Sequence, residues 1–139
     1  MVTGHKDGSI KLWDTEKNQQ IGELENIHGG IESQPYKEYR SEIYKLAFSP
    51  DGQYLFSVGA PGKIVMWDMT ARLPLCQPFG TMRGLGDLIV GPAGKTLMTT
   101  GDETIIWDVD PESWKKLALR IASRDLTREE WRRLMGEEP

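Results

Sequence analysis

The sequence predicts a mostly β fold of short repeated strands, followed by a C-terminal helical hairpin. The dipeptide Trp-Asp occurs three times, and each copy ends a short apolar run. Trp67 and Trp107, which begin the last two copies, are 40 residues apart, the period of a four-stranded propeller blade. The 15 glycines and 8 prolines are spread between short apolar runs, as is typical of a chain with many β turns. Together these observations predict part of a β-propeller.

Two stretches of the chain align with each other in register. The turn Pro50-Asp51-Gly52 matches Pro92-Ala93-Gly94, and in each turn proline fixes φ while glycine accepts a positive φ. The run Ile64-Val65-Met66-Trp67 is apolar without alternation, which indicates burial on both faces of its sheet, as in a blade between two neighbouring blades. The strands expected in the two stretches are 43–48, 53–58, 63–68, 84–90, 95–100 and 103–108.

The first and last repeats are incomplete. Val2-Thr3-Gly4 is read as the end of a second strand, and strands over 9–14 and about 19–24 follow it. After Trp107-Asp108, Pro111 and a helical pattern stand where a fourth strand would be. Counting two, four and three strands gives about two and a quarter blades, whereas closed propellers have about 4–8. Three interpretations stay open: the C-terminal piece of a longer propeller, a ring closed by several chains, or an open, partly ordered stack.

From Asp110 onward the apolar period becomes helical. Asp110 is a good N-cap and Pro111 suits the first helical position, so a helix is expected over 111–123. A second helix is expected to begin at the capping box of residues 127–130 and to end at Gly136. Because neither helix is long enough to be stable alone, the hairpin is expected to pack on the last blade. Its packing residues are Trp114, Leu117, Ile121, Leu126, Trp131 and Leu134. The predicted domains are an incomplete propeller over 1–109 and a helical tail over 110–139.

Two motifs, at residues 46–52 (LAFSPDG) and 7–14 (DGSIKLWD), resemble the WD-repeat family, and the resemblance covers about 1–109. In that family a buried Trp, a Ser or Thr, a turn Asp and a His form a hydrogen-bonded set in each blade. Pro61 stands at the Asp position of the second repeat, and the Gly-His positions hold Glu38-Tyr39 and Gly80-Thr81, so the sets are expected to be incomplete. The resemblance implies a structural blade core of Thr3, Asp7, Trp13, Ser57, Trp67, Thr99 and Trp107.

The helical tail is similar to the segment that follows the last WD repeat in many bacterial signalling proteins, which often carry an N-terminal switch NTPase domain. The matching positions are Trp114, residues 117–127 and Glu130-Trp131. That family usually has Cys at the position of Leu119 and Asn at the positions of Ser123 and Asp125. This resemblance implies a sensor or scaffold module at the C-terminal end of a multidomain protein. The alternative function that follows from it is a sensor or autoinhibitory segment of a multidomain bacterial signalling ATPase.

No motif in the sequence supports catalysis. Residues 91–96 (GPAGKT) end like a phosphate-binding loop, but Ile89 stands where that loop needs glycine, and a strand is expected where it needs a helix. His5 and His28 are expected to be solvated turn residues, and with one cysteine, Cys76, they do not supply the three or four ligands of a zinc site. We therefore expect no enzyme activity, no cofactor and no bound metal.

The charge pattern gives no reason to expect nucleic acid or a membrane as partner. The net charge is −4, and the basic residues of the tail alternate with acidic ones, as on a solvated helix face. No stretch approaches the roughly 20 apolar residues of a membrane helix, and the first residues have no apolar signal core. The expected location is the cytoplasm.

The function expected from these features is non-enzymatic protein–protein interaction, as a scaffold module. The connection over residues 25–42 is unusually long and contains Tyr36, Tyr39 and Arg40, residue types that are enriched at binding hot spots. A tolerated surface insertion is the other interpretation of this segment. The expected partners are proteins: the missing propeller blades or further copies of this chain.

Overall fold

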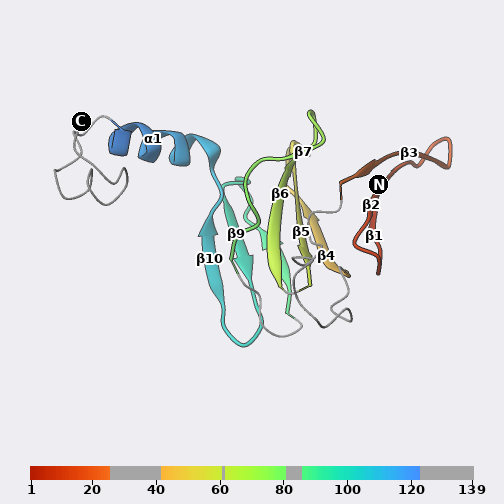
Figure 1. Ribbon diagram of the computed structural model, residues 1–139, viewed down its shortest axis with the longest axis horizontal. Helices are drawn as coiled ribbons and strands as arrows, with labels where there is room; N and C mark the ends of the chain where they lie inside the picture. Colours follow the sequence, from red (N-terminus) through yellow and green to blue (C-terminus); the bar gives the residue numbers. More distant parts are fainter. Residues whose placement is uncertain (26–41, 61, 81–85, 123–139) are drawn as a thin grey trace, which may run out of the picture. The chain divides into compact units, whose positions relative to one another are not determined.

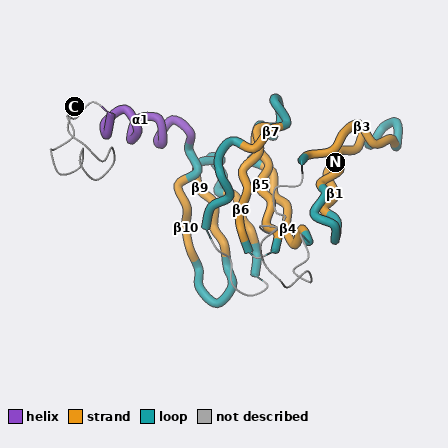
Figure 2. Tube along the Cα trace, in the orientation of Figure 1, coloured by secondary structure: helices purple, strands orange, loops and turns teal. Residues whose placement is uncertain are grey.

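The computed structural model describes residues 1–25, 42–60, 62–80 and 86–122 of the 139 residues (Figure 1). The chain divides into two units, Met1–Asp108 and Val109–Pro139. In the described residues the first unit contains ten strands in three antiparallel sheets, and the second contains one helix (Figure 2). This mostly β architecture, consistent with part of a propeller, confirms the predicted fold class.

The first sheet contains β1 (Val2–Gly4), β2 (Ile10–Asp14) and β3 (Gln19–Leu24), in the order β1-β2-β3. All three residues of β1 pair with β2, so this sheet has three strands rather than the two that were counted from the sequence. Ten strands correspond to two and a half four-stranded blades in the described residues, not to two and a quarter. Val2-Thr3-Gly4 was read from the sequence as the end of a strand, but that strand was left out of the count.

The second sheet is a complete four-stranded blade, with β4 (Ile43–Phe48), β5 (Tyr54–Gly59), β6 (Lys63–Asp68) and β7 (Leu73–Pro74) in sequential order. The first three strands fall within a residue of the predicted bounds. In β6, Ile64, Val65, Met66 and Trp67 are all 0% exposed. Because successive side chains of a strand point to opposite faces, both faces of this sheet are covered, as the unbroken apolar run predicted.

The third sheet contains β8 (Leu88–Val90), β9 (Thr96–Thr99) and β10 (Ile105–Asp108), in the order β10-β9-β8. These strands are shorter than the predicted ranges of 84–90, 95–100 and 103–108, and residues 81–85 lie outside the described part. In the described residues β10 is an edge strand, paired with β9 alone.

The first and second sheets share an apolar core. Its buried side chains are Ile10, Leu12 and Leu24 from the first sheet and Ile43, Leu55, Val65 and Trp67 from the second. The backbone also joins these sheets, since the Ile43 N–H donates to the His5 carbonyl oxygen at 3.0 Å.

The third sheet meets the second sheet on the face that points away from the first sheet. The rings of Phe79 and Trp107 lie edge to face with centroids 5.8 Å apart. Lys45 Nζ lies 2.8 Å from Asp87 Oδ1, although both groups are exposed, so this ion pair contributes little stability. The second sheet is therefore enclosed between the other two.

Gly4 allows the close approach of the first two sheets. A Cβ placed on Gly4 would lie 2.5 Å from Ile43 Cγ2 and 2.7 Å from Ile43 Cβ. We expect Gly4→Ala to lower the free energy of unfolding by about 1–3 kcal/mol, because the two sheets must shift apart. Urea denaturation measures this, with Thr15→Ala in an exposed turn of the same sheet as control. An unchanged midpoint for Gly4→Ala would contradict the sheet contact.

The helix α1 (Pro111–Ala122) begins where the sequence predicted, after an N-cap at Asp110. The Asp110 carboxylate accepts a hydrogen bond from the Glu112 N–H at 3.1 Å, which satisfies one of the free donors of the first turn. Leu117 and Ile121 are 47% and 53% exposed. The second predicted helix, with Leu126, Trp131 and Leu134, lies outside the described residues. Packing of the tail on the last blade stays a prediction.

Candidate functional site

Each sheet contains a tryptophan whose indole N–H donates to a hydroxyl oxygen on the neighbouring strand. The donor–acceptor distances are 2.8 Å for Trp13 and Thr3, 2.8 Å for Trp67 and Ser57, and 3.0 Å for Trp107 and Thr99. In the second and third sheets the register explains the pairing, because Ser57 faces Val65 and Thr99 faces Ile105, each two residues before the tryptophan. The hydroxyl and the indole are thus diagonal neighbours on one face of the sheet. One fully buried ring, Trp67, and two partly buried rings, Trp13 and Trp107, thus keep a hydrogen-bond partner for the indole N–H.

The first of these pairs extends to a histidine. His5 Nε2 lies 3.0 Å from Thr3 Oγ1, and the His5 side chain is partly buried. His5 does lie at a turn, as expected, but its ring is partly buried beside the Thr3 hydroxyl rather than fully solvated. The signal was present in the sequence, since residues two apart in an extended chain point to the same side. The family pattern places the histidine before the blade, so His5, which lies within the first sheet's own repeat, was overlooked.

Two aspartates hold the turns between strands. The Asp7 carboxylate accepts hydrogen bonds from the Ser9 backbone N–H at 3.0 Å and from the Ser9 hydroxyl at 2.7 Å, and these bonds lower the pKa of Asp7. Asp51 accepts hydrogen bonds from the Ser49 hydroxyl and from the Gln53 N–H, and these lower the pKa of Asp51 in the same way. Both carboxylates stay charged at neutral pH and act in turn structure.

We expect folding stability to fall in acid partly because Asp51 becomes protonated. Its folded-state pKa lies below its unfolded value of about 4, so its contribution is present above pH 4 and is lost as the pH falls through the folded pKa. Asp51→Asn should lower stability at neutral pH and flatten the acid side of the profile. Urea midpoints measured from neutral pH downward test this. Parallel profiles for the two chains would contradict the role of Asp51.

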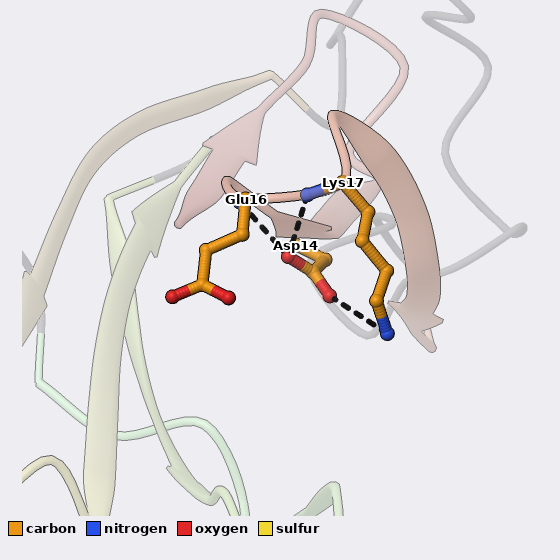
Figure 3. Close-up of polar contacts among 3 residues, drawn as sticks. All are labelled: Asp14, Glu16 and Lys17. Atoms are coloured by element: carbon orange, nitrogen blue, oxygen red, sulfur yellow. Dashed lines mark hydrogen bonds and ion pairs between the residues drawn. The ribbon is translucent and has the colours of Figure 1, made fainter.

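The aspartate of the Trp-Asp dipeptide caps the turn that follows it, a role that the sequence analysis missed. Asp14 Oδ1 accepts the N–H groups of Glu16 and Lys17 at 2.9 and 3.1 Å, and the Lys17 ammonium lies 3.7 Å from Asp14 Oδ2 (Figure 3). Asp68 Oδ1 accepts the equivalent N–H groups of the next repeat at 2.7 and 2.9 Å. Aspartate is favoured at such positions because its short side chain reaches the backbone two residues ahead. In these two copies the aspartate of the dipeptide thus caps the turn that directly follows the tryptophan.

The face of the third sheet that points away from Trp107 carries an apolar row, which we call the outer row: Ile89, Met98 and Ile106. These residues are partners in register across β8, β9 and β10. Ile89 is 47% exposed and Ile106 is 69% exposed. In the second sheet the positions of Met98 and Ile106 are held by Phe56 and Met66, both 0% exposed. The outer row therefore occupies positions that are covered one sheet earlier, and it is the candidate interaction surface.

The structure does not bring the other predicted site residues together. The three tryptophan–hydroxyl pairs lie in three separate sheets. Tyr36, Tyr39 and Arg40 lie outside the described residues, as do Glu38, Pro61 and Thr81. Among the described residues no three His, Cys, Asp or Glu side chains are close enough to hold a metal ion. In the same residues no helix is long and apolar enough to span a membrane.

Comparison with known proteins supports the repeat. Residues 33–68 match the family model "WD domain, G-beta repeat". Cilia- and flagella-associated protein 52 of Bos taurus is 30% identical over 108 residues, which cover 73% of this chain and 15% of that protein. The Mus musculus protein of the same name is also 30% identical over 108 residues, with 73% and 16% covered. WD repeat-containing protein 91 of Xenopus tropicalis is 30% identical over 69 residues, which are 50% of this chain and 8% of that protein.

The chain thus contains a WD40 repeat, and it spans only a small part of each relative. WD40 repeats are in general protein–protein interaction scaffolds.

Proposed function

We propose that this chain is a non-enzymatic protein–protein interaction segment, the C-terminal part of a WD-repeat propeller that works in the cytoplasm. The WD40 match and the three stacked sheets support this assignment. The single observation that carries it is the outer row, an apolar surface with Ile106 69% exposed at a position that is buried in the other two sheets. Exposed apolar patches on folded proteins mark sites of association.

The partner surface in this proposal has two parts. One is the outer row, which fits the face of a further propeller blade, because blades bury such rows against one another. The other is the connection over 25–42, where Tyr36, Tyr39 and Arg40 would act as anchors. A rigid stack of sheets would hold both parts without any chemical step.

The test compares proteins captured from a lysate of the source organism by three baits: the unaltered chain, Ile106→Asp and Lys17→Ala. Lys17 has a 74% exposed side chain on a turn of the first sheet and serves as control. We expect a set of proteins to be captured by the unaltered and control baits and lost with Ile106→Asp. Equal capture by all three baits, or turnover by the pure chain in a hydrolase and nucleotide panel, would overturn the proposal.

A second candidate is a sensor or autoinhibitory segment of a multidomain bacterial signalling ATPase. Its support is the tail resemblance at Trp114 and residues 117–127, together with a helix that begins at Pro111 directly after the last sheet. The named relatives are animal proteins with no such domain in their names. The source gene decides between the candidates: an NTPase reading frame joined upstream supports the second, and further WD repeats without one support the first.

A further inference from the structure

The outer row occupies repeat positions that are buried in the other two sheets of this chain. The residue before each Trp-Asp tryptophan lies on the sheet face away from that tryptophan, and these residues are Leu12, Met66 and Ile106. Leu12 is 5% exposed in the core shared with the second sheet, and Met66 is 0% exposed. Ile106 is 69% exposed, so within the sheets of the described residues the third sheet exposes the face that is buried in the other two.

The cover at each internal junction is the tryptophan face of the following sheet. Trp67 belongs to the core that buries Leu12, and Trp107 contacts Phe79 of the second sheet. The first sheet has such a face as well, with Trp13 bonded to Thr3. Since the first sheet packs on the second through Ile10, Leu12 and Leu24, its tryptophan face points the other way, and Trp13 is only partly buried.

We propose that two copies of this chain associate head to tail, with the Trp13 face of one copy seated on the outer row of the other. The chain has both surfaces that such a junction needs: the outer row of the third sheet and the Trp13 face of the first sheet. The contact would repeat the sheet-on-sheet packing that the chain uses twice internally. It joins two different surfaces, so it is a heterologous contact that can continue to further copies or close into a ring.

The polar groups on these faces are compatible with such a contact. The outer row is entirely apolar. Beside Trp13, Lys11 and Glu23 are direct partners in register across β2 and β3, so opposite charges stand next to each other. Lys11 occupies the position that Val65 holds in the second sheet, where it is 0% exposed. Glutamate at residue 11 would place two like charges, residue 11 and Glu23, side by side in this face, and burying them against the outer row would weaken the contact.

Sedimentation velocity over a wide range of concentration tests this proposal, which rests on the proposed function. We expect the unaltered chain to form dimers and larger species as its concentration rises. Ile106→Asp and Lys11→Glu should each raise the dissociation constant by at least about tenfold. Leu73→Asp, at a 57% exposed residue of β7, is the matched control and should leave association unchanged. Circular dichroism verifies that each variant is folded.

Mixing the two variants gives the decisive result. A head-to-tail contact predicts that Ile106→Asp, which keeps its Trp13 face, and Lys11→Glu, which keeps its outer row, form a one-to-one dimer together although each is monomeric alone. A chain that is monomeric at every concentration, or association that Ile106→Asp leaves intact, would overturn the proposal. If the chain is monomeric but its capture of other proteins still depends on Ile106, the proposed function stands and only the second copy is excluded as partner.

Discussion

Replacing Trp67 with alanine is expected to lower the free energy of unfolding by about 3–5 kcal/mol, a large part of the total for a domain of this size. The indole is 0% exposed, belongs to the core between the first two sheets, and donates a hydrogen bond to Ser57 at 2.8 Å. Alanine removes both the packing and the hydrogen bond. Urea denaturation followed by circular dichroism measures the loss.

Two controls separate the causes of that loss. Trp67→Phe keeps most of the ring volume but has no N–H for the Ser57 hydroxyl, so we expect about 1–3 kcal/mol. Trp107→Ala should cost less than Trp67→Ala, because Trp107 is only partly buried. If Trp107→Ala is as damaging as Trp67→Ala, the second sheet is not the enclosed centre of the stack.

The second large effect is expected at Met66, with Ile106 as its matched partner. Both residues precede a Trp-Asp tryptophan, but Met66 is 0% exposed and Ile106 is 69% exposed. Met66→Ala should cost about 2–5 kcal/mol through lost burial and the cavity that remains. Ile106→Ala should change the stability of the monomer by less than about 1 kcal/mol. Chemical denaturation at low protein concentration tests the pair.

The comparison of these two variants is informative because Met66 and Ile106 hold the same position in the repeat. Equal destabilisation at low concentration would mean that the outer row is covered within a single chain. A loss for Ile106→Ala that appears only at high concentration would agree with the head-to-tail contact, since association stabilises the folded state by mass action.

The fold could be predicted from the sequence because several local signals agreed. The unbroken apolar run of β6, the Pro-Gly turns and the 40-residue spacing of Trp67 and Trp107 all pointed to stacked sheets. The N-cap at Asp110 placed the start of α1. Apart from the repeat spacing, each of these signals depends on backbone preference or on side-chain period, which act over a few residues.

The features that were not predicted from the sequence depend on contacts that only the folded chain brings together or on local contacts that were overlooked. β1 was read from the sequence as the end of a strand but was not counted, and its pairing with β2 along all three residues makes it a full member of the first sheet. The bond between His5 and Thr3 and the turn caps of Asp14 and Asp68 join residues two positions apart, so these local signals were present in the sequence and were overlooked. The exposure of Ile106 is set by what covers the third sheet, and a repeat pattern alone assigns to that residue the burial of its counterpart Met66.

Residue-resolved amide hydrogen exchange, at a concentration where the chain sediments as a monomer, tests the central claim most directly. The claim is that the second sheet is enclosed and that the outer face of the third is open. It predicts the slowest exchange in the inner strands β5 and β6 and clearly faster exchange in the edge strand β10, because local opening is easiest where fewest contacts are lost. Exchange in β10 as slow as in β6 would contradict the claim.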